Sequence, residues 1–174
     1  MQDFVQHTLH ALAVHQPSVG SLSVFFASKM LFVLLLIALW RFWVRRKQLT
    51  WRLLAQLVLL GAFAGVLTLL GLHVVQDPRP FMVEGYEPLT DASRDNGFPS
   101  DHTLAAALLT MGVFWLDRKW TWPLALGTLL VLLGRLAIGA HHTLDVLGSL
   151  GIVALSALLA RWLPLPEGWT RKAP

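Results

Sequence analysis

Long apolar runs limit most strongly how this chain can fold. Five such runs alternate with polar or charged connections, at residues 21–44, 53–75, 103–116, 122–138 and 144–163. A helix needs about 20 apolar residues to cross the hydrocarbon core of a bilayer. The sequence therefore predicts an all-α, integral membrane helical bundle with about five transmembrane helices.

The composition also indicates a membrane protein. Apolar residues make up 55% of the 174 residues and charged residues only 14%, whereas soluble domains contain about 45–50% and about 25%. The eight tryptophans and nine phenylalanines suit the aromatic belts of membrane interfaces. The absence of cysteine excludes disulfides, thiolate metal ligands and a cysteine nucleophile. We expect one membrane-embedded domain over residues 1–174.

The first 18 residues precede the apolar runs and are too short and too polar to span a bilayer. Phe4, Val5, Leu9 and Leu12 fall near one helical face, which predicts an interfacial helix over residues 1–18. A secretory signal peptide is the alternative, but no basic segment precedes an apolar core here.

Basic residues occur at alternate connections between the apolar runs. They gather at residues 41–52, at Arg118 and Lys119, and again in the C-terminal tail. Because cytoplasmic connections are enriched in Lys and Arg, we expect these segments to face the cytoplasm. This pattern explains the net charge of +4 better than nucleic-acid binding does. The polar loop 76–99, the start of the third run and the turn at Ala140 then share the opposite face.

His141 and Asp145 are four residues apart, so a helix places them on one face. The carboxylate would accept the proton of one imidazole nitrogen and leave the other nitrogen free to attack phosphorus. These residues are explained equally well as a loop histidine and the cap of the following helix.

The segment Pro99 to His102 has the composition of a helix start, with Ser100 and Asp101 ahead of an apolar run. The unpaired amides of a helix N-terminus suit an anionic oxygen, and His102 there could protonate a leaving group. Taken alone, the segment is an ordinary helix cap with a solvated histidine.

Arg79 and Arg135 supply forked donors that bind phosphate bidentately. Singly, each arginine is explained as a charge that flanks a membrane span. Their position on the same predicted face as His102 and His141 favours a phosphate site. We expect no metal there, since no cysteine is present and two arginines would repel a cation. The adjacent His141 and His142 would also point about 100° apart on a helix.

Three motifs of the chain resemble the type 2 phosphatidic acid phosphatase superfamily, namely Arg79-Pro80, Pro99-Ser100-Asp101-His102 and Arg135-x5-His141-x3-Asp145. Residues 76–149 are most similar to bacterial undecaprenyl pyrophosphate phosphatases of the bacitracin-resistance type. The resemblance implies three catalytic residues, which are the nucleophile His141, its orienting partner Asp145 and the general acid His102. It implies four phosphate-binding residues, which are Arg79, Arg135, Ser100 and Asp101.

The resemblance also implies an activity. A metal-independent, cofactor-free enzyme of the bacterial inner membrane would hydrolyse undecaprenyl pyrophosphate to the monophosphate through a phosphohistidine. Its site would face the periplasm or cell exterior, and it would recycle the cell-wall carrier lipid and lower bacitracin sensitivity. Alternatives within the family are a phosphatidylglycerophosphate or phosphatidic acid phosphatase and a lipid phosphotransferase. A non-catalytic lipid-binding or transport protein is the alternative from another class.

Three positions depart from the family pattern. Leu72 stands where a lysine is usual, Gly134 where a serine precedes the arginine, and His142 where an aromatic residue follows the nucleophile. Lys29 lies inside the first apolar run, where a lysine costs about 2.5–3.5 kcal/mol at a helix centre. Either its long stem reaches the interface, or its charge is an accessory group that replaces the missing lysine at the site.

Overall fold

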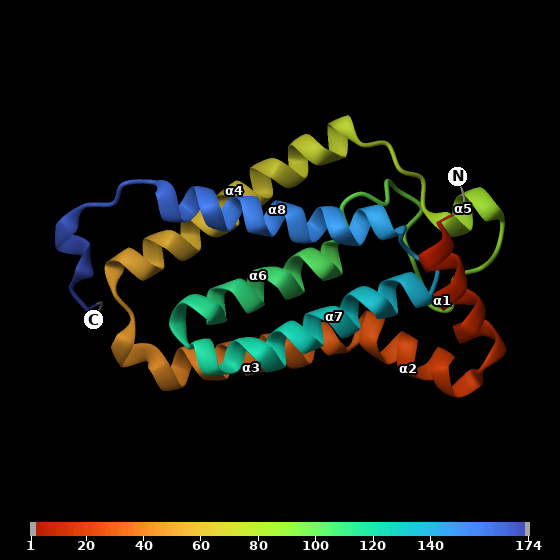
Figure 1. Ribbon diagram of the computed structural model, residues 1–174, viewed down its shortest axis with the longest axis horizontal. Helices are drawn as coiled ribbons and strands as arrows, with labels where there is room; N and C mark the ends of the chain where they lie inside the picture. Colours follow the sequence, from red (N-terminus) through yellow and green to blue (C-terminus); the bar gives the residue numbers. More distant parts are fainter. Residues whose placement is uncertain (1–2, 173–174) are drawn as a thin grey trace.

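The computed structural model describes residues 3–172 and shows an all-α bundle (Figure 1). Within this range no β-strand occurs, and only two isolated bridges form. Helices α1 to α8 are Phe4–His15, Pro17–Ser28, Met30–Arg45, Trp51–Val74, Pro80–Glu84, Asp101–Leu116, Thr121–Ala137 and Thr143–Trp162. Short 3₁₀ helices η1 to η3 are Arg46–Gln48, Arg118–Trp120 and Glu167–Thr170. The predicted fold class is confirmed.

The expected spans correspond to helices of unequal length. In the described part of the chain, three helical segments are long and apolar enough to cross a membrane: Trp51–Val74, Arg118–Ala137 and Thr143–Trp162. The pair α2 and α3 would form a fourth, bent span. Helix α6 is apolar but has only 16 residues, which extend about 24 Å at 1.5 Å per residue.

The first apolar run is not one straight helix. It breaks at Lys29 into α2 and α3, which meet at an angle of 44°. The break lets the two halves pack on different partners. Helix α2 packs along α7, whereas α3 packs on α6 as well. Leu34 and Ala38 of α3 lie in a buried cluster with Ala106 and Val131.

Helix α2 approaches α7 closely at Gly134. A Cβ atom on this residue would lie 2.7 Å from the backbone nitrogen of Ala27 and 3.0 Å from Cβ of Phe26. A side chain therefore does not fit without movement of the α2 backbone. The departure from serine at this position has a packing reason that the sequence did not reveal.

The two ends of the bundle differ in chemistry. The basic connection after α3, the turn between α6 and α7, and the helix η3 lie at one end (Figure 1). The loop 76–99 with α5, the start of α6 and the turn between α7 and α8 lie at the other end. The residues expected to form the site therefore share one end, as the alternating charges predicted.

A buried ion cluster ties α3 to the end of α6 at the basic end. Arg41 and Arg45 both donate to the Asp117 carboxylate, and the Arg41 guanidinium lies over the rings of Trp40 and Trp120. Burial raises the pKa of Asp117, but the two arginines outweigh it and hold the pKa below its usual value.

Helix α1 packs against α2 and α7 rather than standing apart. Its contact side includes the buried Gln6 and Ala13, whereas Phe4 and Val5 are exposed. Exposed apolar side chains are compatible with a helix at the membrane surface. Its location at the interface stays a prediction.

Candidate active site

His141 lies in the turn that joins α7 to α8, and the local sequence shapes this turn. Gly139 adopts a φ of +79°, a left-handed conformation that favours glycine. Its amide donates to the carbonyl of Leu136, and the next amide, of Ala140, donates to the carbonyl of Arg135. The chain thus leaves α7 sharply and brings His141 back beside Arg135.

The imidazole of His141 is buried, and contacts on both sides fix its tautomer. Nδ1 lies 3.0 Å from the carbonyl oxygen of Gly97 and 3.3 Å from Oδ2 of Asp145. Both partners accept hydrogen bonds, so Nδ1 carries the proton. Nε2 lies 3.1 Å from Nη1 of Arg79 and 3.2 Å from Nη2 of Arg135. Arginine can only donate, so the Nε2 lone pair faces both guanidinium groups.

Electrostatics keep this histidine neutral. Burial, followed by the charges of Arg135 and Arg79, places the pKa of His141 well below its usual value. A neutral imidazole is the form that attacks an electrophile, because its free nitrogen keeps the lone pair. An anion between the arginines would meet Nε2 directly.

Arg79 is held from several sides at the N-cap of α5. Its Nη2 donates to Asp95 at 2.7 Å and to Ser93 at 3.0 Å, and its Nη1 donates to the carbonyl of Ala140 at 3.2 Å. The Asp95 carboxylate is exposed, and its hydrogen bond with Arg79 lowers its pKa. Asp95 thus occupies donors that a phosphate would also use.

Arg135 belongs to the last turn of α7 and is buried. Apart from the contact with His141, its guanidinium has spare donors, and its Nε has no partner. A buried donor without an acceptor costs about 1–3 kcal/mol. An anionic group at this position would remove that cost.

The start of α6 contributes the expected Ser100, Asp101 and His102. Ser100 is fully buried, and its hydroxyl accepts from Thr103 at 3.2 Å, which leaves its own proton free to donate. Its amide donates to the carbonyl of Asp145 at 3.3 Å. Asp101 is exposed and His102 is partly buried. The helix start therefore adjoins the His141 turn through Ser100.

Asp145 combines the two roles that the sequence left open. Its Oδ2 accepts from the backbone amide of His142 at 2.9 Å, which caps α8, and it also contacts Nδ1 of His141. Gly97 lies against it, because a Cβ atom there would be 2.9 Å from Oδ2. Asp145 is completely buried, and its Oδ1 has no hydrogen-bond partner.

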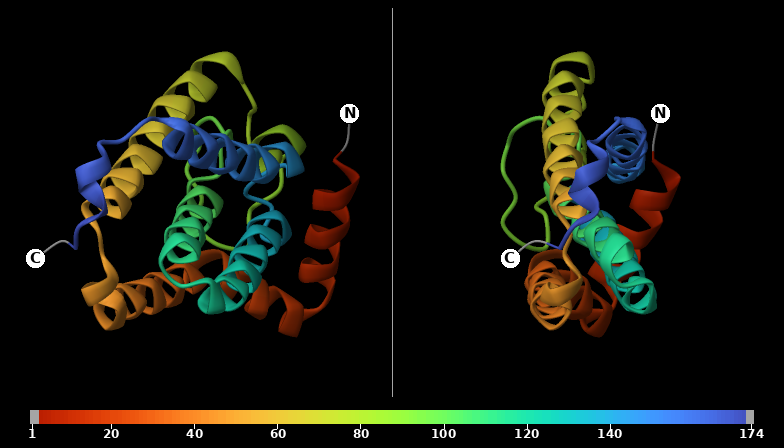
Figure 2. Two further views of the ribbon diagram at one scale, coloured as in Figure 1. Left: turned by 60° about the vertical axis from the view of Figure 1, so that its left-hand side comes forward. Right: turned by 90° about the vertical axis from the view of Figure 1, so that its left-hand side faces the viewer.

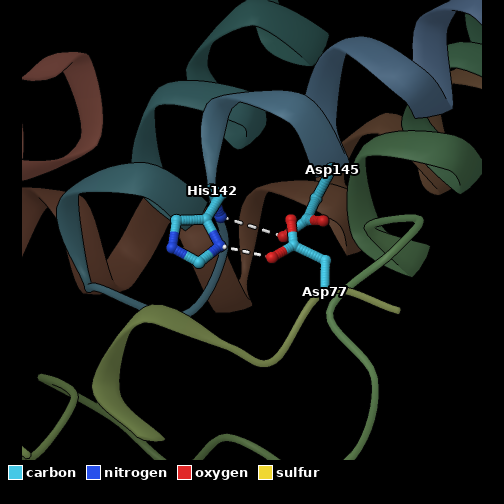
Figure 3. Close-up of side chains that lie close together, drawn as sticks. All are labelled: Asp77, His142 and Asp145. Carbon is cyan, nitrogen blue, oxygen red and sulfur yellow. Dashed lines mark hydrogen bonds and ion pairs between the residues drawn. The ribbon is translucent and has the colours of Figure 1, made fainter. Parts of the chain in front are cut away.

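Asp77 is a member of this cluster that sequence reasoning missed. Its Oδ1 lies 3.2 Å from Nδ1 of His142, and its carboxylate faces Asp145 (Figure 3). Burial first, and then the charge of Asp145, raises the pKa of Asp77, although His142 opposes this. Asp77 lies two residues before Arg79, but nothing local in the sequence indicates its contact with His142.

A second group of missed residues braces the His141 turn from outside. The Tyr86 hydroxyl donates to the carbonyl of Gly139 at 3.1 Å and accepts from Gln6 at 3.0 Å. His10 stacks on Tyr86 and its Nδ1 lies 2.9 Å from the carbonyl of Ala137. These contacts join α1 to the turn, and nothing local in the sequence indicates them.

Asp3 makes a further contact between α1 and the site region. It caps α1 through the amide of Gln6 and also accepts from the amide and hydroxyl of Thr143 at the start of α8. Burial raises the pKa of Asp3, but these hydrogen bonds outweigh it and lower the pKa.

The structure does not join Lys29 to this cluster. Its side chain is exposed at the break between α2 and α3. Lys29 bonds only through its backbone, and none of the side-chain hydrogen bonds or ion pairs found for residues 3–172 includes its ammonium group. An accessory role for Lys29 stays a prediction.

The fold and this cluster define a class of protein, a helical membrane protein with a buried histidine that faces two arginines at one end. The chain belongs to the PAP2 superfamily, whose family model matches residues 50–169. The resemblance of the three motifs is therefore confirmed.

Two relatives give the comparison more detail. Undecaprenyl-diphosphatase BcrC of Bacillus subtilis (strain 168) is 29% identical over 157 residues, which cover 87% of this chain and 78% of BcrC. A crystal structure of a transmembrane PAP2-type phosphatidylglycerolphosphate phosphatase from Bacillus subtilis has a similar fold, with a TM-score of 0.57. The match covers 92% of this chain and 86% of the other, with 22% sequence identity.

Proposed function

We propose that this chain hydrolyses undecaprenyl diphosphate to undecaprenyl phosphate and inorganic phosphate. The family supports a membrane lipid phosphatase, and the similarity to BcrC supports the polyprenyl diphosphate as the substrate. The observation that carries the proposal is the contact of His141 Nε2 with both arginines while Nδ1 is held by Asp145 and Gly97.

The first step forms a covalent intermediate. Arg79 and Arg135 turn from Nε2 to the oxygens of the terminal phosphate, whose negative charge they neutralise. Nε2 of His141 then forms a bond to phosphorus as the bond to the bridging oxygen breaks. His102 gives its proton to the leaving lipid phosphate. The positive charge on the His141 ring is stabilised by Asp145.

The second step releases phosphate. Water attacks the phosphorus atom from the position that the lipid phosphate has left, and His102 accepts its proton. The bond between phosphorus and Nε2 breaks, and the electron pair returns to His141. Inorganic phosphate leaves, and the proton balance of the site is restored. We place this reaction on the extracytoplasmic face, because the basic connections lie at the opposite end.

The test is phosphate release by purified protein in detergent with a chelator present. Undecaprenyl diphosphate, phosphatidylglycerophosphate and phosphatidic acid are compared at equal concentrations. We expect the polyprenyl diphosphate to give the highest kcat/KM. We also expect His141→Ala to lower kcat by about 10³-fold or more, since the nucleophile is removed. A preference for a glycerolipid would keep the mechanism and overturn the substrate. No release from any lipid would overturn the activity.

A further inference from the structure

His142 stands where an aromatic residue usually follows the nucleophile of this family. Its Nδ1 lies 3.2 Å from Oδ1 of Asp77 (Figure 3). This nitrogen, one oxygen of Asp77 and one oxygen of Asp145 all lie within 4.8 Å of one another. Two carboxylates and an imidazole thus converge beside the turn that carries His141.

Hydrogen bonds satisfy only part of this cluster. Asp145 is completely buried, its Oδ1 has no partner, and its carboxylate faces Asp77 and His142 (Figure 3). Nδ1 of His142 also lacks a hydrogen bond of good geometry. Arg79 and Arg135 contact Nε2 of His141, whereas Asp145 contacts its Nδ1. The imidazole ring therefore separates the two arginine contacts from the cluster.

We propose that Asp77, His142 and Asp145 bind one divalent transition-metal ion of the Zn²⁺ type, and that the bound ion inhibits the enzyme. Neutral imidazole and carboxylate oxygen are ligands that Zn²⁺ accepts at about 2.0–2.2 Å. Ligand atoms at that distance are about 3.3 Å apart in a tetrahedral site. The observed separations reach this spacing with small movements of Asp77 and His142, whose side chains are 21% and 20% exposed. Water completes the fourth position from the exposed side.

Inhibition follows because Asp145 would bind the metal ion and orient His141 with the same carboxylate. Its carboxylate holds Nδ1–H of His141 and stabilises the charge that develops on the ring during attack. A cation bound to the same carboxylate withdraws electron density from it and adds positive charge next to that ring. The nucleophile is then both less well oriented and less reactive. This effect on turnover rests on the proposed phosphatase activity, whereas the binding of the ion does not.

Binding is tested first and without substrate. The full chain, in detergent and free of chelator, is titrated with ZnCl₂ by isothermal calorimetry. We expect one site in the wild type, with affinity lowered about tenfold or more in His142→Phe and in Asp77→Asn, because a ligand is lost. His73→Phe, which removes an exposed histidine of α4, is the matched control and keeps the site. Equal affinity in the wild type and both cluster variants would overturn the proposal.

Turnover is tested with the same variants. His142→Phe keeps the backbone amide that bonds to Asp145, so we expect it to release phosphate at the wild-type rate in chelator. Zinc at the measured Kd should halve the wild-type rate, and excess chelator should restore it. His142→Phe should resist this zinc concentration. Equal inhibition of both proteins would mean that zinc acts on the diphosphate substrate, and it would overturn the inhibitory role. Absence of turnover in chelator would overturn the proposed function, while the calorimetry still decides the site.

Discussion

The substitution Asp145→Asn separates the charge of this residue from its geometry. The amide oxygen can replace Oδ2 and accept from both the His142 amide and Nδ1 of His141, and the amide nitrogen takes the place of Oδ1, which has no partner. The tautomer is also held by Gly97 and the two arginines. The structure therefore predicts that this variant keeps the orientation of His141 and loses only the negative charge.

The size of the effect follows from the distance. Two unit charges 3.3 Å apart interact with about 5 kcal/mol at an effective dielectric constant of about 20, which sets the upper limit. The difference between a charged and a neutral hydrogen bond, about 1–2 kcal/mol, sets the lower limit. We therefore expect kcat to fall by between about 10-fold and about 5,000-fold. KM should change little, because the arginines hold the phosphate.

The assay is steady-state phosphate release in chelator, with Asp91→Asn as the matched control. Asp91 is an exposed carboxylate in the loop 76–99, so its loss should leave kcat and KM unchanged. A kcat for Asp145→Asn within twofold of the wild type would show that the carboxylate charge does not assist the reaction. A change confined to KM would place Asp145 in substrate binding instead.

Three further substitutions test the packing and charge contacts. Gly134→Ser should lower the free energy of unfolding by about 1–3 kcal/mol, and with it the midpoint of thermal unfolding, because the new Cβ would lie 2.7 Å from the backbone of α2. An unchanged midpoint would refute the tight contact. Asp95→Asn should lower the inhibition constant for inorganic phosphate several-fold, since it removes a charged competitor for Arg79; an unchanged or higher constant would contradict that competition. Asp117→Ala should destabilise the fold by about 3–5 kcal/mol by leaving Arg41 buried and unpaired. Because folding lowers the pKa of Asp117, its contribution to the free energy of unfolding is present above the usual carboxyl pKa and is lost as pH falls through the folded-state pKa. Chemical denaturation of the wild type and the variant at several pH values measures both effects. A stability difference between the two proteins that does not shrink in acid would refute the assignment.

Local patterns in the sequence predicted the parts of the structure that depend on near neighbours. The apolar runs predicted the long helices, and the spacing of His141 and Asp145 predicted their contact. The alternation of basic connections predicted that Arg79 and Arg135 would meet at one end. In each case, helix periodicity or the alternation of segments across the membrane fixes the geometry.

The remaining parts depend on contacts between distant segments. Tyr86 and Gln6 are 80 positions apart in the chain and meet only because α1 folds over the His141 turn. Asp77 joins His142 in the same way. The break at Lys29 follows from the different partners of α2 and α3, not from a proline or glycine at the bend. A single sequence has no local signal for such contacts.

The formation of a phosphohistidine on His141 tests the account most directly. Undecaprenyl diphosphate labelled on its terminal phosphate is mixed with the enzyme, and the reaction is stopped within one turnover in alkaline denaturant, which preserves the bond between phosphorus and nitrogen. Peptide mapping then locates the label. We predict label on the peptide that contains His141 and none in His141→Ala. Label on another residue, or full turnover by His141→Ala, would contradict the account.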